Sequence, residues 1–101
     1  MNGASIERDG DLFRLSGELN MQTVPALWQQ AGSQLPQAGA AIVVDLGAVD
    51  RCDSAALALL VEWMRAARGR GVEIGFRNLP PQLVDIAGLT GLGDMLPVVK
   101  S

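Results

Sequence analysis

The 101-residue sequence has no histidine, no tyrosine and one cysteine, and each absence excludes a class of chemistry. Without histidine, the chain cannot assemble a Ser–His–Asp or Cys–His nucleophilic site, nor a hydrolytic zinc site built on imidazole. The single Cys52 permits no internal disulfide and no structural zinc site. The only lysine is Lys100, so a Walker-type phosphate loop is missing as well. We therefore expect no catalytic residue, no metal and no cofactor.

Positive charge is also scarce. Eight basic residues face eleven acidic ones, which gives a net charge of −3. Because nucleic acids and anionic membranes attract basic proteins, neither is an expected partner. Arg65, Arg68 and Arg70 cluster where a helix is predicted to end, and there they complement the negative end of its dipole.

Long apolar runs and targeting segments are missing too. The longest apolar run, Ala55–Val61, is far shorter than the ~20 residues that cross a bilayer. The N-terminus lacks the basic and apolar regions of a secretory signal. The expected protein is therefore cytoplasmic, without direct insertion into a membrane.

What the sequence does contain is the pattern of one α/β domain over residues 1–101, with a hydrophobic fraction of 49%. Asp9–Gly10–Asp11 between extended segments predicts a hairpin. The apolar run 41–46 predicts a central, parallel strand, and 72–77 predicts another strand. Helices are predicted from Thr23 to about Leu35, over 54–68 and after Pro80. With an edge strand at 95–99, the expected fold is a mixed, mostly parallel sheet of four to five strands with three to four helices.

The helix predicted over 54–68 has the most informative pattern. One stripe of it must face the sheet, and its members are Leu57, Leu60, Val61 and Met64. Further apolar side chains lie away from that stripe; these are Ala55, Leu59, Trp63 and Ala66. An exposed apolar strip of this kind indicates a binding surface. For Trp63 a second interpretation stays open, in which the N-terminal hairpin or the C-terminal tail covers the indole.

Residues at the start of this helix have alternative interpretations. Asp53 or Ser54 can cap the helix by accepting a hydrogen bond from a free backbone N–H. Asp45, Asp50 and Asp53 lie near one end of the predicted central strand and could serve acid–base chemistry, but turn and cap roles are commoner for aspartate. A helix start can also activate a thiol, although burial as an inert side chain is the preferred interpretation of Cys52.

The run 49–60, with Asp53–Ser54–Ala55–Ala56 at its centre, resembles the signature of STAS domains, the fold of bacterial anti-sigma factor antagonists. Leu15–Ser16–Gly17–Glu18–Leu19 and the ending Leu89–Thr90–Gly91–Leu92 resemble the same family, in the same order along the chain. The resemblance implies a STAS fold and a non-catalytic domain that binds other proteins.

Two branches of the family imply different partners. In anti-sigma factor antagonists, a kinase phosphorylates the hydroxyl two residues after the Asp; that position is Ala55 here, which leaves Ser54 as the alternative phosphorylation site. The MlaB branch, which the chain resembles more, implies an accessory subunit of a phospholipid ABC transporter that maintains outer-membrane lipid asymmetry. The implied partner is its ATPase subunit (MlaF-like), in a complex with a permease at the inner membrane. The expected partner-binding residues are Asp53, Ser54, Ala55, Ala58, Leu59, Glu62 and Trp63.

Overall fold

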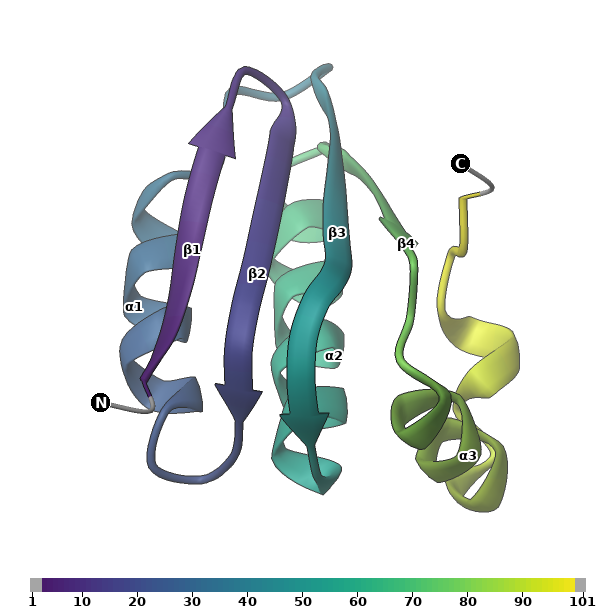
Figure 1. Cartoon of the computed structure of the whole chain (residues 1–101). Helices are drawn as coiled ribbons and strands as arrows, with labels where there is room; N and C mark the ends of the chain where they lie inside the picture. Colours follow the sequence, from purple (N-terminus) through teal and green to yellow (C-terminus); the bar gives the residue numbers. More distant parts are fainter. Residues whose placement is uncertain (1–2, 100–101) are drawn as a thin grey trace.

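The computed structural model describes residues 3–99, which form one four-stranded sheet and three α-helices. In chain order the elements are β1 (Ala4–Asp9), β2 (Leu12–Leu19), α1 (Val24–Ser33), β3 (Ala41–Cys52), α2 (Ser54–Gly69), β4 (Glu73–Arg77), α3 (Pro81–Thr90) and the short 3-10 helix η1 (Gly93–Met95). The strand order is β1-β2-β3-β4, antiparallel between β1 and β2 and parallel elsewhere. The predicted mixed, mostly parallel sheet is confirmed (Figure 1).

The predicted hairpin joins β1 to β2. Gly10 adopts a φ of 62°, the left-handed conformation that glycine tolerates best, and Asp9 pairs with Leu12 across the turn. The predicted central strand is confirmed as β3, which pairs in parallel with both neighbours and continues to Cys52.

Helices α1 and α2 lie against one face of the sheet, α3 lies beside it beyond the end of β4, and no element of residues 3–99 covers the other face (Figure 1). Alternation along the strands separates the two faces. Side chains that face the helices are fully buried, among them Phe13, Leu15, Val44, Leu46 and Phe76. At the register Arg14–Asp45–Arg77, the residues on the open face are charged. Within residues 3–99, no helix is both long and apolar enough to cross a membrane.

The C-terminal segment differs from the predicted edge strand. Residues 93–95 form η1, and the chain then makes a single parallel bridge between Val98 and Phe76. Phe76 N–H donates to the Pro97 carbonyl at 2.8 Å, and Val99 N–H donates to the Phe76 carbonyl at 2.7 Å. Because proline has no N–H, Pro97 cannot extend the ladder as a donor.

The first helix also differs in detail, since α1 ends at Ser33 rather than near Leu35. Thr23 occupies the capping position, but its hydroxyl does not cap the helix. It accepts from Asn20 N–H at 3.0 Å and donates to the Glu18 carbonyl at 2.8 Å, so it fastens the connection from β2 instead.

Candidate partner-binding site

The start of α2 lies at the carboxyl ends of two parallel strands. Asp53 links β3 directly to α2, and its own N–H donates to the Leu19 carbonyl at the end of β2, at 3.2 Å. Its side-chain Oδ1 accepts a hydrogen bond from Ala55 N–H at 2.8 Å, in an extended backbone conformation with φ −126° and ψ −163°. Of the two predicted capping residues, Asp53 therefore caps the helix, an interaction worth about 1 kcal/mol.

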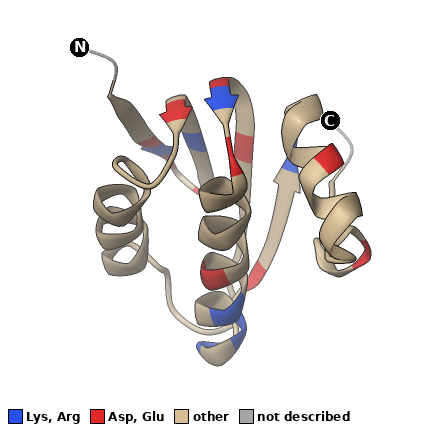
Figure 2. Ribbon diagram, turned by 90° about the horizontal axis from the view of Figure 1, so that it is seen from below, with Lys and Arg blue, Asp and Glu red and all other residues tan. Residues whose placement is uncertain are grey.

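Small side chains occupy the exposed side of this helix start. Ser54 and Ala58 are exposed and Ala55 is half-buried. Among the described residues, the Ser54 hydroxyl has no hydrogen-bond partner, which leaves it free to meet another molecule. No charge interrupts α2 before the exposed Glu62, two turns on (Figure 2). We call this set the helix-start surface; its members are Asp53, Ser54, Ala55, Ala58 and Glu62.

Leu59 and Trp63 do not belong to that surface. The expected exposure of Leu59 is wrong, whereas for Trp63 the alternative in which the N-terminal hairpin covers the indole is confirmed. Leu59 is 1% exposed and Trp63 is 0% exposed. The Trp63 ring packs edge-on against Phe13 of β2, with the ring centroids 5.5 Å apart and an interplanar angle of 82°. The reason is the central position of α2, which contacts α1 on one side and α3 on the other as well as the sheet below. Because α1, α3 and the sheet all pack against α2, they bury a much wider part of its surface than the single predicted stripe.

The structure adds two features beside the helix start that the sequence pattern did not indicate. Met21, in the connection after β2, is 79% exposed, two residues beyond the carbonyl that binds Asp53 N–H. Gln82 of α3 accepts from Cys52 N–H at 3.3 Å through Oε1. An apolar residue between a strand end and a helix start was the available signal for Met21. No sequence signal indicated the contact of Gln82 with Cys52, because the position of Gln82 depends on how α3 packs.

A hollow of about 680 Å³ opens on the α3 side of the helix start. It lies between the end of β3 and the connection from β4 to α3. Its lining residues are Leu46, Gly47, Val49, Asp50, Asn78, Leu79, Pro80, Pro81 and Gln82. The only ionisable group among them is the Asp50 carboxylate, so the hollow offers a contact surface and little chemistry.

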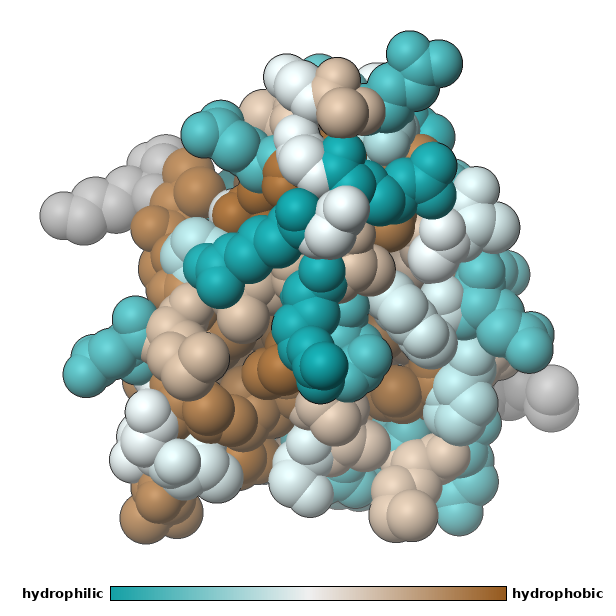
Figure 3. Space-filling model, turned by 180° about the vertical axis from the view of Figure 1, so that it is seen from behind, coloured by the Kyte–Doolittle hydropathy of each residue, from teal (hydrophilic) through white to brown (hydrophobic). Residues whose placement is uncertain are grey.

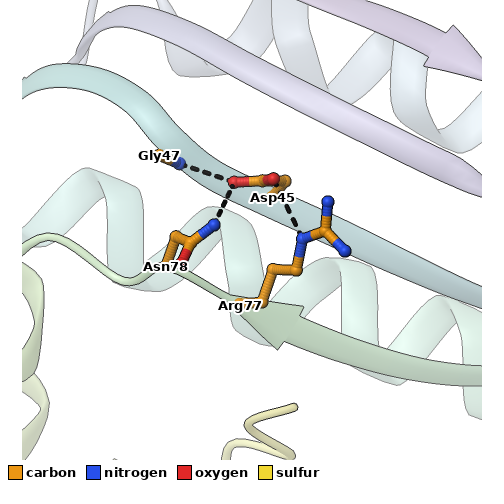
Figure 4. A network of polar contacts seen from close by, with 4 residues as sticks. All are labelled: Asp45, Gly47, Arg77 and Asn78. Carbon is orange, nitrogen blue, oxygen red and sulfur yellow. Dashed lines mark hydrogen bonds and ion pairs between the residues drawn. The ribbon is translucent and has the colours of Figure 1, made fainter. Parts of the chain in front are cut away.

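Asp45 is held in a hydrogen-bond network on the open face of the sheet (Figure 4). Its carboxylate accepts from Gly47 N–H at 2.8 Å, from Arg77 Nε at 2.9 Å and from Asn78 Nδ2 at 3.1 Å. Burial raises the pKa of the Asp45 carboxyl, but the hydrogen bonds from Gly47, Asn78 and Arg77 outweigh it and hold the pKa below its ordinary value. A carboxylate satisfied in this way fastens β3 to β4 and is a poor proton donor.

Cys52 shows no sign of activation. The thiol is half-buried, and burial, followed by the charge of Asp53, raises its pKa above the ordinary value. A thiol with a raised pKa stays protonated at neutral pH and is a weak nucleophile. Across residues 3–99, no three histidine, cysteine, aspartate or glutamate side chains gather in a geometry that would hold a metal ion.

Comparison with solved structures places this architecture among STAS domains. An anti-sigma factor antagonist from Mycobacterium paratuberculosis is 28% identical, with a TM-score of 0.75 over 94% of this chain and 82% of that one. The antagonist SpoIIAA in its unphosphorylated form is 17% identical, with a TM-score of 0.74 over 97% and 87%. A chain of the Acinetobacter MlaFEDB complex in an ATP-bound conformation is 22% identical, with a TM-score of 0.72 over 89% and 95%.

A search of curated protein sequences gave no match. The protein-family model described as "Mlab, STAS domain" matches residues 3–98, which is nearly the whole chain. The chain therefore belongs to the MlaB family of STAS domains.

Proposed function

We propose that this domain is a non-catalytic accessory subunit that binds the ATPase of a phospholipid ABC transporter through its helix-start surface. The observation that carries the proposal is a helix start capped by Asp53, with small exposed side chains and no charge between Asp53 and Glu62. Ser54 and Ala58 project no bulk, so the backbone of α2 can approach a folded partner closely. Membership of the MlaB family and the likeness to a chain of the MlaFEDB complex favour an ATPase as that partner.

Such a subunit acts through binding free energy alone. If it binds the assembled, competent ATPase more tightly than the separated subunits, it shifts the population toward the competent form. The subunit then resides on the cytoplasmic side of the inner membrane, held there by the transporter and its permease. No catalytic residue is required for this effect.

Co-purification with an MlaF-like ATPase from the same organism tests the proposal. Ser54→Arg and Ala58→Arg both place a long charged side chain on the surface, and arginine is a good helix former, so the domain should stay folded. Both variants should lose the ATPase. The matched control is Ser33→Arg, at the exposed end of α1, which should retain it.

Circular dichroism of each isolated variant establishes that loss of binding is not loss of fold. Retention of the ATPase by both folded variants would overturn the proposal. Loss of the ATPase by Ser33→Arg as well would also count against it, because the effect would then not belong to the helix-start surface.

A second function has a specific observation in its favour. The Ser54 hydroxyl is exposed and free, and the chain is 28% identical to an anti-sigma factor antagonist. Phosphorylation there would add up to about two negative charges at a helix start and could release a bound partner. Incubation with a cognate anti-sigma kinase, followed by intact mass measurement of wild type and Ser54→Ala, decides the matter. A phosphate on the wild type that the variant lacks supports this function; an unchanged wild-type mass removes it.

A further inference from the structure

Exposed apolar side chains concentrate at one place in the molecule, away from the helix-start surface. Six large hydrophobic residues of the described chain are exposed, and five of them lie between Val84 and Val99. Leu89 reaches an exposed fraction of 89%, which is extreme for a leucine in a helix. We call the four most exposed of these five side chains the α3 patch; its members are Val84, Leu89, Met95 and Val98. Several exposed apolar side chains in one region of a fold are typical of an interaction surface.

The α3 patch borders a groove. The groove has a volume of about 340 Å³ and lies between α3, η1 and the C-terminal segment. Its lining residues are Leu79, Val84, Ala87, Gly93, Leu96 and Val98. Figure 3 shows apolar side chains gathered on the left of the molecule, where α3 and the segment after it lie. A groove of this kind can accept apolar side chains from a helix laid along it.

Gly88 provides a second, independent observation. It lies within α3 and is exposed, and a Cβ built on it would meet nothing within 4 Å. Glycine inside a helix costs up to about 1 kcal/mol relative to alanine. Nothing in residues 3–99 requires the small size of Gly88. A bare helix backbone between Val84 and Leu89 lets another chain approach closely.

The charges around the α3 patch select its occupant. Residues 78–99 contain two acidic side chains, Asp85 and Asp94, both exposed, and no basic one. A second copy would bring these carboxylates against each other, and an anionic lipid surface would be repelled by them. The nearest hollow with a cation is formed mainly by β3 and β4 residues; Arg68 and Glu73 both line it, and it shares only Val98 with the groove. The patch therefore fits a cationic partner.

We propose that the α3 patch docks an amphipathic helix of another protein, with apolar side chains in the groove and lysine or arginine side chains beside Asp85 and Asp94. This interaction is separate from the helix-start surface and does not depend on the proposed function. The partner chemistry is that of a basic amphipathic helix, in which anchors recur every three or four residues.

Titration with two synthetic helical peptides tests the proposal. One carries leucines at helical spacing (i, i+3, i+4, i+7) and lysines at the other positions to form a basic amphipathic helix, and the other replaces each lysine with glutamate. Added to the isotope-labelled domain, the lysine peptide should shift the NMR signals of Val84, Leu89 and Val98, whereas the glutamate peptide should not. Val84→Glu and Gly88→Leu should each raise the Kd of the lysine peptide by about tenfold or more.

Three controls separate this surface from general attraction to an acidic protein. Met21→Glu adds the same charge at another exposed apolar residue, and Ser54→Arg alters the helix-start surface. Neither substitution should lower the affinity of the domain for the lysine peptide. Gly88→Ala should stabilise the domain without blocking the groove. Equal binding of the two peptides, shifts centred on α2, or unchanged affinity in folded Val84→Glu and Gly88→Leu variants would each overturn the proposal. So would a dimer of the unliganded domain that Leu89→Glu dissociates.

Discussion

Ser54 and Ala55 differ by one hydroxyl group, and the position of that group separates the two functions proposed for the domain. An alanine two residues after Asp53 offers no phosphate acceptor. Its N–H is already held by the Asp53 side chain at 2.8 Å. The remaining hydroxyl, on Ser54, is exposed at the first residue of α2. Under the proposed function, the helix start is a permanent contact surface with one free hydroxyl.

The Asp45 network makes a pH-dependent contribution to stability. Its side chain is 14% exposed and carries a pKa below the ordinary value of 3.8. A group with a lowered folded-state pKa stabilises the fold above its unfolded pKa, and this contribution is lost as the pH falls through the folded-state value. Asp45→Asn should lower the free energy of unfolding by about 1–3 kcal/mol at neutral pH.

Urea denaturation of wild type and Asp45→Asn across a pH series measures this effect. The difference between the two should stay constant from neutral pH down to the ordinary pKa of 3.8, and shrink below it. A difference that grows in acid would contradict the lowered pKa. Asp50→Asn, at an exposed residue of the same strand, is the matched control and should change stability by less than about 0.5 kcal/mol.

Among the elements, α2 shows both the strength and the limit of prediction from sequence. Helical periodicity correctly placed Leu57, Leu60 and Met64 in the core. It could not tell that Leu59 and Trp63 are buried too, because periodicity describes one helix and not the number of neighbours packed around it. The contacts of α2 with α1 and α3 come from the topology of the whole chain.

Trp63→Ala tests the corrected position of the indole. A fully buried tryptophan that packs on Phe13 should cost about 3–5 kcal/mol of stability when truncated, because it leaves a large cavity between α2 and β2. Equilibrium denaturation in urea gives the value. Met21→Ala, at an exposed residue, should stay within about 0.5 kcal/mol of wild type. A Trp63→Ala loss as small as that of Met21→Ala would restore the interpretation of Trp63 as a surface residue.

For the whole molecule, the hairpin, the parallel strands and the three helices followed from local signals such as Gly10 and the apolar run that became β3. The Asp45–Arg77 pair did not, because it depends on the register of β3 against β4. The groove beside α3 likewise depends on how residues 93–99 fold back toward β4. Short-range pattern thus defined the layers, whereas contacts between distant segments defined the surfaces.

The helix-start surface and the α3 patch occupy different elements, so one copy of the domain can bind two protein segments at once. The helix-start surface carries small side chains between Asp53 and Glu62, whereas the α3 patch is apolar, with Asp85 and Asp94 next to its members in the sequence. A partner bound at the helix-start surface leaves the α3 patch accessible if its footprint does not extend from residues 53–62 onto α3. The set of residues that the ATPase covers on the domain is therefore the quantity to measure.

Amide hydrogen exchange of the domain with and without the MlaF-like ATPase measures it directly. The first amides of a helix lack intrahelical partners and exchange readily in the free protein, apart from those held by the cap. If the ATPase binds the helix-start surface, it should slow exchange over residues 53–62, the segment that contains Ser54 and Ala58. Unchanged exchange across that segment in a complex that demonstrably forms, with protection elsewhere, would contradict it.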